Sequence, residues 1–283
     1  MTRACQFLRH SRQSWYQDHA RNKKRQSRNV HILDFVARVR CRQPRIGTRK
    51  LHYLLNSQTD KTLSIGRDRL FDLLSEHRLL VPVKRAYHKT TNSRHHFYRH
   101  PNLLKPGPGQ VRALEPEQVW VADITYLPLR SGMVYLSLIT DACSRKSMGY
   151  HVGENLQTEN VVKAFIQALR ERKTTGHLVH HSDRGLQYCS ALYQSVHKRN
   201  GIACSMTDGY DCYQNALAER INGILKNEFL LSRPADLAQA RTMVEESVAI
   251  YNHERPHQSL KYKTPDEVHQ AFYSQKTVNL YQD

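Results

Sequence analysis

The sequence predicts an α/β protein in which a mixed five-stranded sheet with flanking helices follows a basic all-α region. Two observations predict this division. Residues 1–112 contain 25 Lys and Arg against 6 Asp and Glu, and their apolar residues recur with helical spacing. Residues 113–283 contain 18 basic and 19 acidic residues and alternate strand-like with helix-like stretches.

The net charge of the chain indicates a polyanionic partner. It is +18 at pH 7, with an isoelectric point near 9.8, and the excess lies in residues 1–112. Basic surfaces of this density are typical of nucleic-acid binding, because neutralised phosphates release condensed counterions. A solubilising surface is the alternative, but a charge excess confined to one half of the chain favours nucleic acid.

The cysteines and the hydropathy indicate where such a protein works. None of the six cysteines forms a C-x-x-C pair, and reduced, scattered thiols are expected in a cytosolic protein of this size. No apolar run approaches the length of about 18 residues that a membrane span needs, and the N-terminus lacks a signal-peptide core. We therefore expect a soluble, cytoplasmic protein.

The front half is expected to be helical. Residues 1–44 form a basic N-terminal helical region, with periodic apolar residues from Val30 onward. Two short amphipathic helices over Gly47–Asn56 and Ser64–Arg78 make residues 45–88 a helix-turn-helix-like DNA-binding segment, although generic helical packing gives the same pattern. The candidate DNA contacts of this segment are Arg45, Arg49, Lys50, Arg67 and Arg69.

A linker over residues 89–116 separates this half from the core, because periodicity disappears there and Pro and Gly recur. The core and its C-terminal helical tail occupy residues 117–283. Strands are expected over Val119–Leu129, Met133–Thr140, Arg145–Val152, Leu178–His181 and Ile202–Met206, and helices over Thr158–Arg172, Ala191–Asn200, Asn215–Leu230 and Val244–Tyr251.

Three acidic residues occur where such a core can use them. Asp123 lies inside the first strand, where a carboxylate is disfavoured unless something offsets its desolvation. Asp183 follows the fourth strand, at the carboxyl end where sites gather in open sheets. Glu219 shares the polar stripe of an amphipathic helix with Asn215, Asn222 and Lys226. Any one such carboxylate is usually a cap, a turn former or a solvated charge, but these are separated by 59 and by 35 residues.

The residues around these acids carry a resemblance to a known family. They read W-V-A-D-I-T-Y, H-S-D-R-G-L-Q-Y and D-G-Y-D-C-Y-Q-N-A-L-A-E-R-I-N-G-I-L-K-N-E, followed by Y-N-H-E-R-P-H-Q-S-L-K-Y-K-T-P. In this order they resemble the second-frame (OrfB) proteins of the insertion-sequence-three family, over nearly the whole chain. The resemblance implies an RNase H-like integrase core and a DDE transposase, with Asp123, Asp183 and Glu219 as catalytic metal ligands.

The expected cofactor is Mg²⁺, with Mn²⁺ as a substitute, because carboxylates suit hard cations and two such ions stabilise an in-line phosphoryl displacement. Zinc on His177, His180 and His181 is not expected, because neighbouring residues of a strand point to opposite faces. Candidate phosphate contacts beside the acids are Lys226, Arg184, Arg220 and Asn222. Near the C-terminus, His253, Arg255 and His257 either lie near DNA or fix a turn around Pro256.

The expected function is DNA cleavage and strand transfer during transposition of an insertion sequence. Two other functions fit parts of the sequence: a catalytically idle DNA-binding protein, and a ribonuclease H-type nuclease acting on RNA–DNA hybrids. The intact acids speak against the first, and the basic front half with the 35-residue spacing speaks against the second. The resemblance also implies double-stranded DNA as the partner, a homo-oligomer on DNA at the nucleoid, and an upstream-frame (OrfA-type) protein or fusion.

Overall fold

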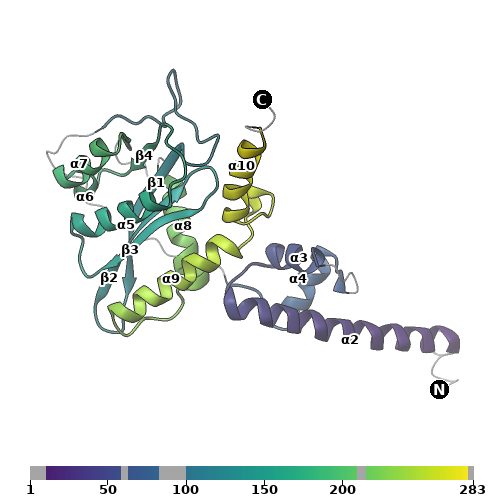
Figure 1. The fold of residues 1–283 in the computed structure, drawn as a ribbon. Helices are drawn as coiled ribbons and strands as arrows, with labels where there is room; N and C mark the ends of the chain where they lie inside the picture. Colours follow the sequence, from purple (N-terminus) through teal and green to yellow (C-terminus); the bar gives the residue numbers. More distant parts are fainter. Residues whose placement is uncertain (1–10, 59–62, 83–99, 209–214, 280–283) are drawn as a thin grey trace. The chain divides into compact units, whose positions relative to one another are not determined.

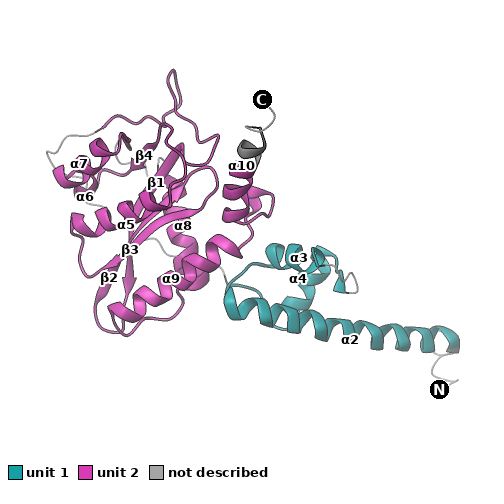
Figure 2. Cartoon of the chain, in the orientation of Figure 1, with its two compact units in different colours: residues 1–84 teal, residues 85–283 magenta. Residues whose placement is uncertain are grey.

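The chain forms two compact units in the computed structural model, Met1–Lys84 and Arg85–Asp283 (Figure 2). Among the described residues, no helix is both long and apolar enough to cross a bilayer. The structure describes residues 11–58, 63–82, 100–208 and 215–279.

Unit 1 is helical in its described part. Helix α2 (Arg12–Arg42) begins after Ser11, whose hydroxyl accepts a hydrogen bond of 3.0 Å from the N–H of Ser14. Helices α3 (Thr48–Asn56) and α4 (Arg67–Glu76) pack on the C-terminal part of α2 (Figure 1). The expected all-α region is therefore confirmed. Its core consists of Ile32, Phe35, Val36, Ile46, Leu51, Leu55, Ile65, Leu70, Leu73 and Leu74.

The loop between α3 and α4 is fastened by Asn56. Its side chain donates to the carbonyl of Ile65 and accepts from the N–H of Ile65, both at 3.1 Å. Helix α3 ends at Asn56 and α4 begins at Arg67, so the connection is longer than the turn of about 3–4 residues typical of a helix-turn-helix. The helix-turn-helix-like assignment stays a prediction.

Unit 2 contains the predicted mixed sheet of five strands, in the order β3-β2-β1-β4-β5. Strands β1, β2 and β3 pair antiparallel, whereas β4 pairs parallel with both β1 and β5. This is the topology of an RNase H-like α/β core, as the family resemblance implied. The strands span Val119–Pro128 (β1), Met133–Asp141 (β2), Ser147–Gly153 (β3), Val179–Ser182 (β4) and Ala203–Met206 (β5).

Helices cover both faces of this sheet, which makes unit 2 a layered sandwich (Figure 1). Helices α5, α6 and α7 lie over one face, and α8, the π-helical turn η3 and α9 lie over the other. The bounds are Thr158–Glu171 (α5), Leu186–Cys189 (α6), Ala191–Arg199 (α7), Ala216–Ile224 (α8), Leu225–Phe229 (η3), Leu237–His253 (α9), Gln258–Leu260 (η4, a 3₁₀ turn) and Pro265–Asn279 (α10).

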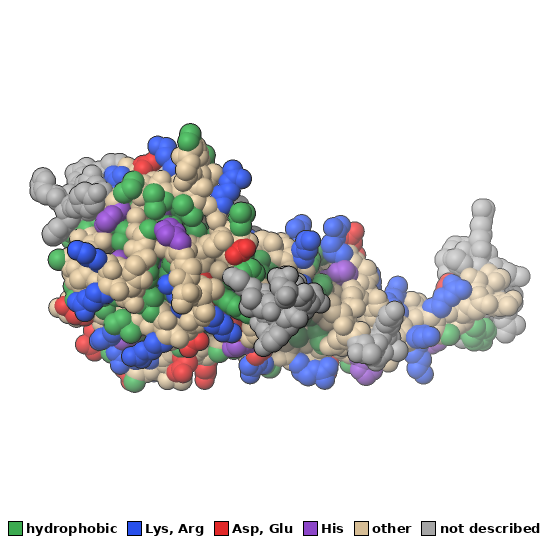
Figure 3. Space-filling model, turned by 45° about the horizontal axis from the view of Figure 1, so that its top comes forward, with side chains coloured by type: hydrophobic (Ala, Val, Ile, Leu, Met, Phe, Trp, Pro, Cys, Tyr) green, Lys and Arg blue, Asp and Glu red, His purple; other side chains and the backbone are tan. Residues whose placement is uncertain are grey.

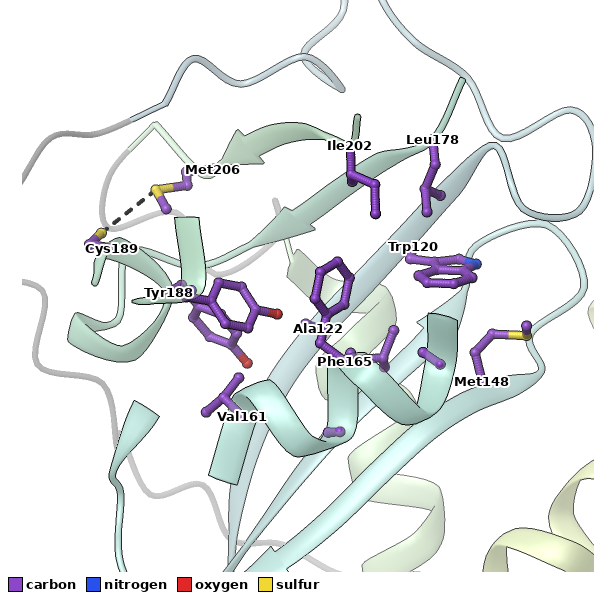
Figure 4. Close-up of a cluster of buried hydrophobic side chains, with 14 residues drawn as sticks. Trp120, Ala122, Met148, Val161, Phe165, Leu178, Tyr188, Cys189, Ile202 and Met206 are labelled. Atoms are coloured by element: carbon purple, nitrogen blue, oxygen red, sulfur yellow. Dashed lines mark hydrogen bonds between the residues drawn. The ribbon is translucent and has the colours of Figure 1, made fainter. Parts of the chain in front are cut away.

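The core under α5 is apolar and aromatic (Figure 4). Trp120 meets Phe165 edge-on at a centroid distance of 6.4 Å, and both are fully buried. Strand β1 alternates as its pleat requires, since Trp120 and Ala122 enter this core while Val119 and Val121 enter another cluster on the opposite face. Strand β1 is therefore buried on both sides, and a carboxylate on it has to be exposed at a strand end or partnered.

The helix expected over Asn215–Leu230 departs from its prediction. It is α-helical only to Ile224, and residues Leu225–Phe229 form a π-turn in which the N–H of Leu230 reaches the carbonyl of Leu225 at 2.9 Å. Apolar periodicity does not distinguish a single wider turn from an α-turn. The π-turn widens the helix beside β1, and such turns are frequent at functional sites.

The described part of the expected linker has no helix or strand, but it is packed. It is part of unit 2 and bonds to the core of that unit, as when the N–H of Leu103 donates to Ser205 Oγ at 2.9 Å. Residues 89–99 lie outside the described part of the chain. The apolar residues that pack against the core are Leu103, Leu104, Val111 and Ala113.

Glu117, directly before β1, is buried in a polar network that also holds α10. Its carboxylate accepts from the N–H groups of Lys173 and Thr174 at 2.9 and 2.7 Å, and lies 3.5 Å from His269 Nε2. Its own N–H donates to Asp141 Oδ2 at 2.6 Å. Burial raises the pKa of Glu117, but the contacts with His269, Lys173 and Thr174 outweigh this effect and hold that pKa at about 2.

Candidate active site

Two of the predicted acids lie at neighbouring positions of parallel strands. In the β1–β4 pairing, Val121 stands opposite His181. The same register continued by two residues sets Asp123 beside Asp183, which directly follows β4. Parallel neighbours are about 4.8 Å apart, so the sheet itself brings these carboxylates together across 60 residues of chain.

The charges of the acids act on one another. Burial, the negative charge of Asp183 and that of Glu219 raise the pKa of Asp123 to about 7, although a hydrogen bond from Asn222 opposes the change. Burial and the charge of Asp183 likewise raise the pKa of Glu219. Each ionised carboxylate therefore destabilises the others, which is the electrostatic condition that a cation would relieve.

Glu219 reaches this site from helix α8 and is exposed. Its charge interacts with Asp183 and Asp123. Within the described residues, however, no three His, Cys, Asp or Glu side chains form a group that could hold a metal ion. The structure thus makes the three acids electrostatic neighbours without drawing them around one point, and their joint metal binding stays a prediction.

Helix α8 and the π-turn are attached to β1 by side-chain hydrogen bonds. Asn222 Nδ2 donates to Asp123 Oδ2 at 2.9 Å, and Lys226 Nζ donates to Thr125 Oγ1 at 3.1 Å. One turn before Glu219, Asn215 Nδ2 donates to the carbonyl of Ala122 at 3.0 Å. The polar stripe of this helix therefore faces the strand that bears Asp123.

Two of the candidate DNA contacts on this helix thus have protein partners. Asn222 is 3% exposed and is bound to Asp123, so its place in the fold is that of a support for this carboxylate. Lys226 is half-buried beside Thr125. Arg184 is half-buried next to Asp183, and Arg220 is exposed next to Glu219.

The turn after β4 shapes the position of Asp183. The N–H of Gly185 donates to Asp183 Oδ1 at 3.0 Å. A Cβ at position 185 would lie 3.0 Å from the same oxygen, so the turn is tight enough to favour glycine there. The phenol of Tyr188, three residues after Gly185, is buried close to Asp183 and Asp123. Its burial and the negative charges of its neighbours, including both aspartates, raise its pKa.

The C-terminal residues His253, Arg255 and His257 were expected either to lie near DNA or to fix a turn around Pro256. For Arg255 and His257 the structure supports the turn. Arg255 forms two hydrogen bonds with Glu228, of 2.7 and 2.8 Å, and a third contact of 2.9 Å with His257 Nε2. The side chain of Arg255 is 4% exposed. Glu228 belongs to the π-turn, so this ion pair fastens the segment that carries Lys226. His253 is exposed and pairs with Asp266.

The two neighbouring histidines of β4 have separate surroundings. His180 lies among aromatic rings, at a centroid distance of 4.9 Å from Phe165. His181 bonds through Nδ1 to Ser205 Oγ at 2.8 Å. They occupy opposite faces of the strand, as the pleat requires.

The basic candidates of the helix-turn-helix-like segment all belong to unit 1. Arg67 bonds to Asp68 at 2.8 Å, and Arg69 lies 3.5 Å from Glu76. Arg49 is exposed, and Arg45 and Lys50 are half-exposed.

Asn215 was expected on the polar stripe with Glu219, but its bond to β1 was not, and Thr125, Tyr188 and Glu228 were not singled out from the sequence at all. Their signal was present in the quoted motifs, where they stand within a few residues of an acid, but spacing alone does not say what they touch.

Two family models, each described as an integrase core domain, match residues 113–212 and 200–265. The 31 kDa protein of insertion element IS600 from Shigella sonnei is 36% identical over 90% of this chain and 93% of its own length. The transposase of insertion sequence element IS629, also from Shigella sonnei, is 35% identical over 58% of this chain and 56% of its own length.

Among solved structures, the catalytic core of HTLV-2 integrase in complex with magnesium aligns with a TM-score of 0.46 at 20% identity, over 56% of this chain and 99% of that one. The family assignment depends on the sequence matches, which extend over both units and include every block around the three acids. By these matches the chain belongs to the DDE transposases of the insertion-sequence-three family.

Proposed function

We propose that this chain cleaves DNA at the ends of an insertion sequence and joins those ends to target DNA, with Asp123, Asp183 and Glu219 as its catalytic carboxylates. Polynucleotidyl transfer is the activity of its family. The observation that supports the assignment is the β1–β4 register, which sets Asp123 beside Asp183, together with the charge of Asp183, which raises the pKa of both Asp123 and Glu219. Acids in mutual repulsion at a strand end are typical of functional sites.

The residues present suit a pair of divalent cations. They offer carboxylate oxygens, which Mg²⁺ prefers as ligands, and the amide of Asn222 supports one of these carboxylates. Mn²⁺ accepts the same ligands. When bound, two such ions stabilise the attacking and the leaving oxygen of an in-line displacement. We propose Mg²⁺ as the physiological ion, held by Asp123, Asp183 and Glu219.

The other residues of the site have supporting parts in this proposal. Asn222 fixes one oxygen of Asp123 and so orients this carboxylate as a ligand. Lys226, whose ammonium lies beside Thr125, offers a positive charge to a DNA phosphate. Arg184 and Arg220, on either side of the acids, are proposed as further phosphate contacts.

We further propose that unit 1 binds duplex DNA through Arg45, Arg49, Lys50, Arg67 and Arg69. Joining two element ends calls for at least two copies of the chain on DNA, and an upstream-frame protein is the expected additional partner. Bound to DNA, the protein would belong to the nucleoid.

The test is a strand-transfer assay on DNA carrying an element end, with Mg²⁺ or Mn²⁺. Asp123→Ala, Asp183→Ala and Glu219→Ala should each abolish joining while end binding in a gel-shift assay stays unchanged. Joining by any of these variants at the wild-type rate would refute the site. Absence of joining by the wild type would favour an idle DNA-binding protein, and preferential cleavage of an RNA–DNA hybrid would favour a ribonuclease H-type enzyme.

A further inference from the structure

Beyond the exposed aromatic pair Trp15 and Tyr16 at its start, the first half of helix α2 has no hydrophobic face. Residues 15–27 are all exposed, and the core of unit 1 takes side chains from α2 only from Ile32 onward. Figure 2 shows this part of α2 projecting past α3 and α4. Between residues 17 and 29 the only apolar residue is Ala20. A helix that is polar all round gains little from packing, so its function lies in its charge.

The cations of this segment are gathered on one side. At roughly 100° per residue, Arg21, Lys24, Arg25 and Arg28 fall within about 100° of one another. The same stripe continues toward the C-terminus as Ile32, Phe35 and Val36, which are buried in the core of unit 1. The cationic stripe, defined as Arg21, Lys24, Arg25 and Arg28, therefore points to the side of α2 on which α3 and α4 pack.

This stripe is short of negative charge. Asp18 is the only acidic residue between positions 15 and 33. It lies 3.6 Å from Arg21, but the two side chains are 55% and 75% exposed, so the pair is weak. Spacings of three and four residues bring Arg21, Lys24, Arg25 and Arg28 into mutual repulsion. Figure 3 shows Lys and Arg side chains recurring over the surface of unit 1.

We propose that the cationic stripe binds the phosphate backbone of duplex DNA, as a second contact surface beside the helix-turn-helix-like segment. This inference rests on the proposed function, which supplies DNA as the polyanion. A second copy of the helix is a poor occupant, because a coiled coil needs a repeated apolar seam. A membrane surface is also a poor occupant, because an interfacial helix needs an apolar face. Charge complementarity leaves a polyanion.

The length of the stripe sets the size of the contact. Arg21 to Arg28 spans about 10 Å of helix at 1.5 Å per residue. Duplex DNA carries one phosphate per roughly 3.4 Å along each strand, so the stripe matches about three phosphates of one strand. The stripe points to the side of α2 on which α3 and α4 pack. A duplex bound to α3 and α4 would therefore continue along α2 and contact the stripe without any change in the fold of unit 1.

The test is the salt dependence of DNA binding by the full-length chain, measured by fluorescence anisotropy with a labelled duplex in the absence of divalent metal. Changing all four stripe residues to Gln should reduce the slope of log K against log salt by about 3, since each phosphate contact contributes about 0.9. Gln has a helix propensity close to that of Lys and Arg, so the helix should persist. Circular dichroism checks this.

A matched pair of double variants separates position from charge. Lys24→Gln/Arg25→Gln removes one Lys and one Arg from the stripe, whereas Lys23→Gln/Arg38→Gln removes the same charges from exposed positions on other sides of α2. The first should weaken binding about tenfold or more at physiological salt, and the second should leave it near wild type. Replacing Arg21, Arg25 and Arg28 by Lys should keep the wild-type slope.

Equal losses from the two double variants would overturn the proposal. So would a loss on hairpin RNA or on anionic lipid vesicles that matches the loss on duplex DNA, because the surface would then serve another polyanion. These readouts need no catalysis. If the wild type fails to join DNA strands, the proposed function fails, but the stripe can still be judged from metal-free binding.

Discussion

The side-chain amide of Asn222 donates a hydrogen bond of 2.9 Å to Asp123 Oδ2, joining helix α8 to strand β1 across 99 residues of chain. The amide is buried, and its bond lowers a pKa that burial and neighbouring acids raise. Asn222 thus stabilises the charged form of Asp123 and fixes the orientation of its carboxylate.

Asn222→Ala is expected to slow strand transfer by about ten- to a hundredfold, the usual cost of losing a residue that orients a metal ligand. End binding should stay unchanged, because unit 1 is untouched. The rate should recover partly at higher Mg²⁺ concentration, since the loss lies in metal affinity. Asn222→Gln, which keeps the amide, is the control. If Asn222→Ala transfers strands as fast as wild type at limiting Mg²⁺, Asn222 does not orient Asp123 as a metal ligand.

The ion pair between Arg255 and Glu228 should be cooperative. Arg255→Met leaves the Glu228 carboxylate without its buried partner and should destabilise the fold by roughly 2–4 kcal/mol, somewhat less than a fully buried pair because Glu228 is 21% exposed. Arg255→Met combined with Glu228→Met should recover most of this loss. Thermal unfolding of the single and double variants measures it, and additive losses would contradict a direct pair.

The same variants report on Lys226. Glu228 lies in the π-turn that carries Lys226, so loss of the ion pair should also disturb Lys226. At a temperature well below its unfolding midpoint, Arg255→Met should therefore lose more strand-transfer activity than the small fraction of unfolded protein explains. The double variant should restore stability more fully than it restores strand transfer. Restoration of both to the same degree would mean that the pair acts on stability alone.

Gly149 on β3 should not tolerate a side chain. A Cβ there would lie 2.2 Å from the carbonyl oxygen of Ala164 and 2.9 Å from Ala168 Cβ, both on α5. Gly149→Ala must therefore push α5 from the sheet, which should cost about 3 kcal/mol or more. Gly176→Ala is the matched control, because nothing lies within 4 Å of its Cβ. Equal unfolding midpoints in urea would contradict the close approach.

Glu117 should make the fold sensitive to acid. Its pKa is about 2 in the fold against 4.5 ordinarily, so the folded state holds the ionised form. Below pH 4.5 the unfolded state binds the proton more readily, and stability is lost as pH falls from 4.5 towards 2. This contribution is roughly 3 kcal/mol and is fully present above pH 4.5.

Urea unfolding at several pH values measures this contribution, and Glu117→Gln should flatten the dependence between pH 4.5 and 2. The buried His197, whose pKa burial lowers to about 4, acts in a different window. Its contribution is lost between pH 6.5 and 4, because the unfolded state protonates first. An unchanged slope for Glu117→Gln below pH 4.5 would contradict the assignment.

Much of the fold could be predicted from the sequence, because strands and helices of unit 2 follow apolar periodicity. The sequence also indicates that Asp123 lies inside one strand and Asp183 directly after another, but only the structure shows that these two strands pair in parallel and bring the acids together. The partner of Asn222 could not. A polar stripe tells which residues share a helix face, but Asn222 faces DNA or a strand depending on tertiary packing.

Other contacts lay beyond sequence reasoning for the same reason. Arg255 and Glu228 are 27 residues apart, and only the packing of α9 against the π-turn joins them. Glu117 directly follows the predicted linker. Neither its φ of 63° nor the burial of its carboxylate can be predicted from the composition of that segment. The π-turn itself keeps the apolar spacing of an α-helix.

The pairing of β1 with β4 gives the site one rigid and one adjustable part. The β1–β4 ladder holds the backbone of the two strands together as far as Val121 and His181, and Asp183 lies in the tight turn that directly follows β4, so the two aspartates have little freedom to move apart. Glu219 stands on a helix whose hold on β1 consists of side-chain contacts, which shift at much lower cost. When substrate binds, the distance measured between labels on β1 and β4 should therefore stay constant. Any tightening of the site should appear as a movement of α8 relative to the sheet.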